Sequence, residues 1–304
     1  MPVGAKTDHR VCWNARLADY LELTKPKISI LVLVTVAVSM FVGNWGPPTP
    51  WLLFHTLVGT ALVAASASAL NQRIERRTDA LMDRTAGRPL PAGRITERDA
   101  LAFGCVTIVL GLAYLALAAN SLTAFVGALT WVLYVVVYTP LKRITPLNTV
   151  VGAVAGALPV LMGWSAVGGS FALGIGGGGL KAATLFLIVY LWQFPHFMAI
   201  AWIYRRQYAA AGLKMLTVVD PSGCRAGVQA VVAALALVPV SLVPVVQHAG
   251  PVYFSAAVAL GLAYLACSAR FCLRRDEPSA RWLLRASLVY LPALLSMFML
   301  VPLV

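Results

Sequence analysis

Nine apolar runs, each long enough to cross a membrane, limit the fold of this sequence more than any other feature. A membrane-spanning helix needs about 20 mostly apolar residues, and because lipid cannot hydrogen-bond exposed backbone, a chain of such runs must be helical. Windows of that length predict spans over residues 28–46, 51–70, 100–118, 121–138, 147–167, 182–203, 227–247, 252–270 and 283–303. Only 12% of the 304 residues are charged, against about 25% in soluble domains. The sequence therefore predicts an all-α polytopic membrane protein, with an amino-terminal segment over 1–27 and one nine-helix domain over 28–304.

The basic residues are confined to alternate connections between the predicted spans. Of the 24 Lys and Arg residues, only Lys181 lies on the opposite side; the others lie in the amino-terminal segment and in 71–99, 142–143, 205–225 and 270–285. Because basic loops stay in the cytoplasm, we expect a cytoplasmic amino terminus and, after an odd number of spans, a carboxyl terminus outside. The net charge of +13 lies at membrane connections, so we expect contact with membrane lipid and none with nucleic acid.

Residues 1–27 bear on the cellular location. They carry Asp8, Asp19 and Glu22 and no apolar stretch, whereas a secretory signal has an apolar core and a transit peptide is poor in acidic residues. The simplest location is the inner membrane of a bacterial cell.

Four candidate metal ligands follow the second predicted span at intervals of four residues. They are Asn71, Glu75, Asp79 and Asp83. In a helix each would stand about 40° round from the one before, so the four would spread over about 120° of one face. The helix should end before Pro89, because proline disfavours helical backbone in the residue before it. Mg²⁺ prefers a few carboxylates together with substrate phosphates, and the alternative interpretation is an ordinary solvated face of i,i+4 ion pairs.

Basic residues near this cluster would face an anionic substrate. Arg84 and Arg88 follow the acidic residues, and a proline-rich stretch after the fourth span carries Lys142, Arg143 and Asn148. Lys142 and Arg143 can reach a phosphate across the cytoplasmic end of the bundle, and Asn148 offers a neutral polar group where the fifth span begins. The other interpretation of this stretch is a turn with two ordinary membrane anchors, and the two are compatible.

A third polar group interrupts the sixth span. The stretch reads Trp192-Gln193-Phe194-Pro195-His196-Phe197, and a proline at membrane depth is tolerated where a helix lines a cavity. Ionisable side chains within the membrane are usually functional, although a hydrogen-bonded core histidine is the rival interpretation for His196. Gln193 and His196 are three residues apart and are predicted to share a face.

Ordered blocks along the chain resemble one enzyme family. The blocks are Asn71-x-x-x-Glu75-x-x-x-Asp79-x-x-Met82-Asp83-Arg84-Thr85-x-x-Arg88-Pro89, then Tyr138-Thr139-x-Leu141-Lys142-Arg143-x-Thr145-x-x-Asn148, then Trp192-Gln193-x-Pro195-His196-Phe197. From about residue 20 onward the chain resembles the protohaem IX farnesyltransferases (haem O synthases) of the UbiA-type membrane prenyltransferase superfamily. The resemblance implies nine helices bundled around a central cavity open to the cytoplasmic side, so that 28–304 would be a prenyltransferase domain.

The resemblance also implies a reaction. A farnesyl group would pass from farnesyl diphosphate to a vinyl group of haem b, with Mg²⁺ assisting departure of the diphosphate, to give haem O. The implied metal ligands are Asn71, Glu75, Asp79 and Asp83; the substrate-binding residues are Arg84, Arg88, Lys142, Arg143, Asn148, Gln193 and Arg206; and the catalytic residues are Asn71, Asp79, Asp83, Lys142 and His196. Whether His196 contacts the haem iron or a propionate stays open. A haem A synthase or an oxidase assembly protein is the implied partner.

One position departs from the family pattern. Family members usually carry an aspartate where this chain has Gln207, and a neutral amide would hold a second Mg²⁺ more weakly. Either Asp220 takes over from a different loop position, or the first cluster carries nearly all the metal binding, or activity is reduced.

Two other functions compete with this assignment. A transporter would place charged groups inside the spans, often in two repeated halves, whereas the acidic residues here gather at one membrane face. A prenyltransferase acting on an aromatic or quinone-precursor acceptor would share the acidic cluster. The Trp192-Gln193-x-Pro195-His196 block and the Met82-Asp83-Arg84-Thr85 run favour haem as the acceptor.

Overall fold

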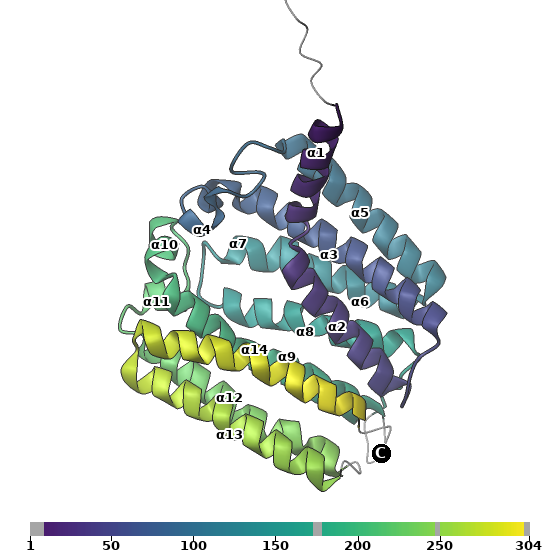
Figure 1. Ribbon diagram of the computed structural model, residues 1–304, viewed down its shortest axis with the longest axis vertical. Coiled ribbons are helices and arrows are strands. Elements are labelled where there is room, and N and C mark those ends of the chain that lie inside the picture. Colours follow the sequence, from purple (N-terminus) through teal and green to yellow (C-terminus); the bar gives the residue numbers. More distant parts are fainter. Residues whose placement is uncertain (1–8, 173–177, 247–249, 301–304) are drawn as a thin grey trace, which may run out of the picture.

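The computed structural model describes residues 9–172, 178–246 and 250–300, and every regular element in these ranges is helical (Figure 1). Nine helical spans within them are long and apolar enough to cross a membrane. The spans are α2 (Pro26–Gly43), α3 (Pro50–Asp79), α5 (Glu97–Ala118), α6 (Ser121–Val132) continued by η1 (Leu133–Tyr138) and α7 (Thr139–Leu141), α8 (Asn148–Ala166), α9 (Gly178–Ile203), α12 (Cys224–Val246), α13 (Pro251–Arg274) and α14 (Glu277–Leu300). The nine predicted spans are therefore confirmed, although residues 247 and 301–303 of the predicted ranges lie outside the described residues.

Two spans extend furthest beyond their predicted ranges. α3 continues past residue 70 to Asp79, and α14 begins at Glu277 instead of residue 283. The predicted spans end with the apolar runs, whereas the four-residue period had already predicted helix through Asn71, Glu75 and Asp79. Side-chain contacts hold the polar extensions as helix: the Gln72 amide donates to the Leu23 carbonyl (2.7 Å), and Arg281 pairs with Glu277 one turn away (2.5 Å). The extension of α3 carries the first three candidate metal ligands out of the span on a rigid helix.

Four short helices lie outside the spans. They are α1 (His9–Leu23), α4 (Asp83–Ala86), α10 (Arg205–Ala210) and α11 (Leu216–Val219). All four lie at the same end of the bundle in Figure 1. α1 belongs to the predicted amino-terminal segment, of which residues 1–8 lie outside the described part of the chain. These helices and the connections around them bring the polar part of the sequence to one end.

α8 is the most enclosed span, with 72% of its window buried. It packs against α2, α6 and α9, while α12, α13 and α14 lie together on one side of the bundle and α3 and α5 on the other (Figure 1). Small residues let the neighbours of α8 approach closely: Gly152, Ala153, Gly156, Ala157 and Gly163. This helix forms the inner wall against which the candidate site is built.

Gly163 marks the closest approach of α2 to α8. A Cβ at this position would lie 2.3 Å from the carbonyl oxygen of Val36, and the Ser39 hydroxyl of α2 donates to the Val160 carbonyl of α8 (2.5 Å). We expect Gly163→Ala to lower the free energy of unfolding by about 1–3 kcal/mol, because a backbone oxygen must shift to admit the methyl group. Unfolding in detergent micelles measures this. Gly87→Ala is the matched control, because nothing lies within 4 Å of its Cβ position, and equal losses in the two variants would contradict the close contact.

Candidate functional site

A cavity of about 350 Å³ lies among α2, α3, η1, α8 and α9. Its charged lining residues are the basic Lys25, Arg84, Arg88 and Lys142 and the acidic Glu75 and Asp79. Its other walls are mostly apolar or aromatic, and include Ile28, Val63, Trp131, Tyr134, Tyr138, Pro159, Met162 and Phe197. The site therefore joins one charged end, called here the polar end, to an apolar interior. A surplus of basic over acidic groups at the polar end favours an anionic ligand.

Asn71 is fully buried and holds two other segments against α3. Its side-chain carbonyl accepts from Lys25 Nζ (2.5 Å), and its amide donates to the Thr139 hydroxyl (2.9 Å). Lys25 precedes Pro26 at the start of α2 and has a left-handed backbone (φ 50°, ψ 62°), an uncommon conformation for a residue with a side chain. Burial and, next, the charge of Arg88 lower the pKa of Lys25 to about 7. The ammonium of Lys25 thus needs a nearby anion to hold its proton firmly.

Glu75 and Lys142 form a buried ion pair at the polar end. Lys142 Nζ lies 2.8 Å from Glu75 Oε1 and 4.5 Å from the centre of the Tyr138 ring. Burial disfavours the charged form of Lys142, but the Glu75 carboxylate, with smaller contributions from Tyr138 and Tyr134, raises the pKa of Lys142 above its usual value. The carboxylate on α3 therefore favours the charged form of Lys142.

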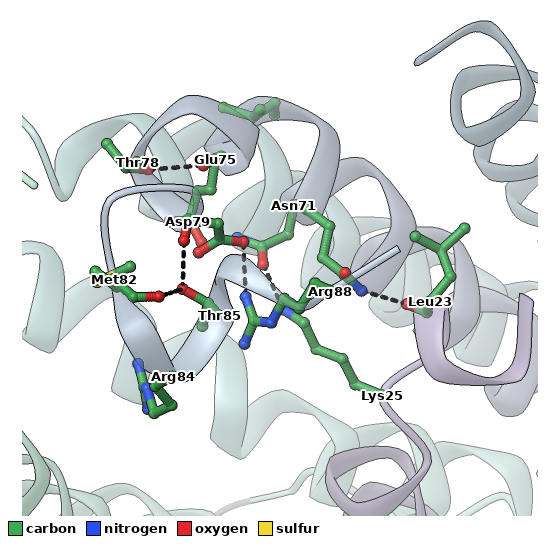
Figure 2. Close-up of polar contacts among 12 residues, drawn as sticks. Leu23, Lys25, Asn71, Glu75, Thr78, Asp79, Met82, Arg84, Thr85 and Arg88 are labelled. Atoms are coloured by element: carbon green, nitrogen blue, oxygen red, sulfur yellow. Dashed lines mark hydrogen bonds and ion pairs between the residues drawn. The ribbon is translucent and has the colours of Figure 1, made fainter. Parts of the chain in front are cut away.

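Asp79 ends α3 and faces Arg88. Arg88 Nη1 donates to Asp79 Oδ2 (2.7 Å), and the Thr85 hydroxyl donates to the Asp79 carbonyl (2.9 Å). Figure 2 shows Arg88 and Lys25 reaching from two other segments towards Asp79 and Asn71 on α3. The prediction that one helix carries all four candidate ligands is wrong, because the chain turns after Asp79 and Asp83 begins the separate helix α4. Asp83 is exposed and is not among the residues that line the cavity.

Two connections close on the polar end from the other side. The Arg84 guanidinium lies over the Tyr204 ring (4.5 Å) and donates to the Tyr208 hydroxyl (3.2 Å). The backbone N–H of Lys214 donates to the Lys142 carbonyl (2.6 Å), and the Asn148 amide donates to the Lys214 carbonyl (3.2 Å). The basic connections 71–99 and 205–225 thus meet at the cavity.

A π-helical segment positions the two tyrosines of the cavity. Tyr134 and Tyr138 belong to η1, and their ring centres lie 5.4 Å apart. The Thr139 hydroxyl donates to the Tyr134 carbonyl (2.8 Å) and so fills the irregular turn. Gly152 of α8 leaves room for Tyr138, whose ring would lie 2.6 Å from a Cβ at that position. π-helical turns of this kind occur often at functional sites.

Gln193 and His196 do not share a face, so that prediction is wrong. The Gln193 amide donates to the Ala153 carbonyl on α8, whereas His196 Nδ1 is hydrogen-bonded to the Ser287 hydroxyl on α14 (2.8 Å) and stacks on Trp192. α9 is packed between α8 and α14, and the 60° between side chains three residues apart is enough to direct them to different neighbours. Gln193 lines the cavity and His196 does not.

The site brings together some of the predicted residues and leaves others outside. The cavity is lined by Glu75, Asp79, Arg84, Arg88, Lys142, Asn148 and Gln193. Arg143 is exposed and donates to the Ile74 carbonyl (3.4 Å), and Arg206 is exposed on α10. Asp220 accepts from the Ser222 hydroxyl and the Arg225 N–H at the start of α12; it is not a cavity residue, so the structure does not favour the idea that it replaces an acidic group at Gln207.

Lys25, Trp131 and Phe197 are cavity residues that the sequence analysis did not assign. Lys25 stood in the Thr24-Lys25-Pro26-Lys27 stretch before the first span, where a basic residue fits an ordinary membrane anchor equally well. Trp131 Nε1 donates to the Ser66 hydroxyl (2.9 Å). Aromatic residues are common in apolar helices, and only the packing separates those that line the cavity.

The donor set suits Mg²⁺ that arrives with a phosphate ligand. Within the described residues, no group of three or more His, Cys, Asp or Glu side chains could hold a metal ion by itself. Glu75 and Asp79 nevertheless both face the cavity and are paired with cations that a phosphate would also attract. Mg²⁺ is typically bound through one or two carboxylates plus substrate phosphates and waters, and these residues offer that arrangement.

Known proteins match both the sequence and the fold. Residues 32–298 match the UbiA prenyltransferase family. The chain is 42% identical over 295 residues to the protoheme IX farnesyltransferase of Solibacter usitatus, covering 93% of this chain and 98% of that protein. A solved digeranylgeranylglyceryl phosphate synthase has a TM-score of 0.78 at 16% identity (95% of this chain, 99% of that one). A UbiA homologue of Archaeoglobus fulgidus bound to GPP and Mg²⁺ has a TM-score of 0.65 at 18% identity (94% and 100%).

Proposed function

The chain belongs to the UbiA prenyltransferase family, and from this premise we propose that it is a protohaem IX farnesyltransferase. It transfers the farnesyl group of farnesyl diphosphate to a vinyl group of haem b and so produces haem O. The main support for this function is the cavity, which has both carboxylates and cations at its polar end and an apolar interior beyond. The near full-length similarity to a protoheme IX farnesyltransferase supports haem as the acceptor.

The polar end binds the diphosphate. Lys25, Arg88 and Lys142 each lie against an acceptor on α3, so a diphosphate can replace or join that acceptor without a large movement. Glu75 and Asp79, with Asn71, would hold Mg²⁺, which when bound neutralises the charge that builds on the departing diphosphate. Charge-assisted contacts from the lysines and arginines stabilise the same negative charge. Asp83, the fourth ligand predicted from the sequence, is exposed on α4 and does not line the cavity, so the proposed metal site does not include it.

The apolar interior holds the hydrocarbon parts of the substrates. An allylic cation must be shielded from bulk water until it meets the acceptor, and most of the walls beyond the polar end are apolar or aromatic. The Tyr134, Tyr138 and Trp131 rings line the route from the polar end, and the faces of aromatic rings attract cations. Trp164 does not line the cavity; it is packed in the core, where its Nε1 donates to the Ser170 carbonyl (3.1 Å).

The polar end of the cavity lies on the cytoplasmic side under this proposal. The basic connections 71–99, 142–143 and 205–225 surround it, and basic loops are retained in the cytoplasm. The amino terminus is then cytoplasmic and the carboxyl terminus outside, in the inner membrane of a bacterial cell. A haem A synthase or oxidase assembly protein would receive the product.

The test supplies both kinds of acceptor to one preparation. Purified protein in lipid nanodiscs is incubated with farnesyl diphosphate, Mg²⁺ and equimolar haem b and 4-hydroxybenzoate. Mass spectrometry is expected to find haem b heavier by one farnesyl group and one hydroxyl group, and no prenylated benzoate. Prenylated benzoate without farnesylated haem would overturn the proposal in favour of an aromatic acceptor.

A further inference from the structure

Gln193 places a fixed polar group in the apolar interior of the cavity. The side chain is only 5% exposed and comes from α9. Its Nε2 donates to the Ala153 carbonyl (3.0 Å) and to the Val189 carbonyl (3.1 Å). Both amide hydrogens are therefore engaged, and the orientation of the carboxamide follows from them, with Oε1 on the remaining side.

The Gln193 Oε1 atom has no donor among the described residues. It lies over Gly156, where a Cβ would be 2.2 Å from it, so the absence of a side chain at 156 makes room for this oxygen. Pro159, Met162 and Phe197 also line the cavity and carry no side-chain hydrogen-bond donor. Since Gln193 lines the cavity and no hydrogen bond to Oε1 is formed within the part of the chain that the structure describes, this oxygen is free to accept from a bound molecule that carries an O–H or N–H group.

Gln193 lies one helical turn deeper than the polar end. Tyr138, whose ring contacts Lys142, lies over Gly152 of α8, and Gln193 lies over Gly156. Four residues of helix correspond to about 6 Å. The carbon bonded to a diphosphate at Lys142 would thus be close to the level of Gln193, so its carboxamide faces the region where the new bonds form.

We propose that Gln193 Oε1 positions the water molecule that supplies the hydroxyl group of haem O. This rests on the proposed function. The bond between farnesyl C1 and the diphosphate oxygen breaks, C1 bonds to the outer carbon of the vinyl group, and the inner vinyl carbon becomes cationic. The oxygen of the water bonds to that inner carbon, and one of its protons leaves to the diphosphate or to solvent, with no oxidation or reduction.

Water is the hydrogen-bond donor that can reach Oε1 when both substrates are bound. A farnesyl chain and the vinyl edge of a porphyrin carry no O–H or N–H group, so neither can satisfy Oε1. A water that donates one hydrogen to Oε1 keeps a lone pair free for the cationic carbon. Gln193 is therefore a positioning residue. When no water is in place, the cation instead loses a proton from the adjacent carbon and an alkene results.

The test measures how the product divides between hydrated and unhydrated forms. Gln193→Leu removes the acceptor at similar volume, and Gly156→Ala keeps the carboxamide but displaces Oε1. Each is expected to raise the fraction of farnesylated haem that is lighter by one water at least tenfold over the parent protein. Thr184→Val is the matched control, because Thr184 is buried on the same helix, bonds to Leu180 and does not line the cavity; its product fractions should equal those of the parent.

The other possible results of this experiment each contradict one part of the proposal. Unchanged product fractions in either folded variant, whatever the total yield, overturn the water-positioning role. A higher KM for haem b with unchanged fractions assigns Oε1 to a protonated propionate instead. If the parent protein makes no farnesylated haem at all, the proposed function fails and this inference fails with it.

Discussion

Asp79→Asn is expected to lower the rate of haem farnesylation by about 10²–10³-fold, the usual loss when one charge-stabilising group is removed from an active site. Asparagine has nearly the same shape, so Arg88 keeps a neighbour while the site loses one of its two buried negative charges. With less negative charge, the site binds Mg²⁺ more weakly. The rate is measured against Mg²⁺ concentration, and the variant should need more Mg²⁺ for half its maximal rate.

Asp83→Asn is the control for this experiment. It removes the same charge only four residues away, but from an exposed position on α4, so we expect its rate to stay within about threefold of the parent because exposed charges are well screened. Equal losses in the two variants would show that the acidic residues act through net charge rather than through the geometry of α3. A full rate in Asp79→Asn would remove the metal role from α3.

Lys142→Met is expected to reduce both stability and substrate binding. The substitution leaves the Glu75 carboxylate buried without its partner, and breaking a buried ion pair in this way costs about 3–5 kcal/mol of unfolding free energy. The KM for farnesyl diphosphate should rise at least about tenfold, because truncating one side of a buried charge contact commonly costs more than 2 kcal/mol of binding. Denaturant unfolding in mixed micelles and steady-state kinetics measure the two effects.

A second substitution separates these effects. Glu75→Gln in the Lys142→Met background removes the uncompensated charge, so the double variant should recover to within about 1 kcal/mol of the parent stability. Its activity should stay low, because both a cation for the diphosphate and a proposed metal ligand are gone. Recovery of activity together with stability would mean that the pair serves folding alone.

The sequence predicted the spans because hydrophobic length is a local property, and it missed features that depend on tertiary contacts. The period of four residues correctly predicted a helix through Asn71, Glu75 and Asp79. The same period continues to Asp83, and nothing local separates it; the turn after Asp79 depends on the Thr85 hydroxyl and the Arg88 pair. The three-residue spacing of Gln193 and His196 likewise does not show that Gln193 contacts α8 while His196 contacts α14.

The left-handed backbone at Lys25 links the amino-terminal helix to the reaction chamber. α1 is held to the rest of the protein through the Leu23 carbonyl on Gln72 and through Arg94, which contacts Asp19 (2.6 Å) and Glu22 (2.7 Å). Thr24 follows Leu23 directly and is followed by Lys25, whose ammonium donates a hydrogen bond to the Asn71 side-chain carbonyl. A change that strains α1 would therefore also move Lys25, the lysine proposed to bind the diphosphate, so protein engineering should leave residues 9–27 unchanged.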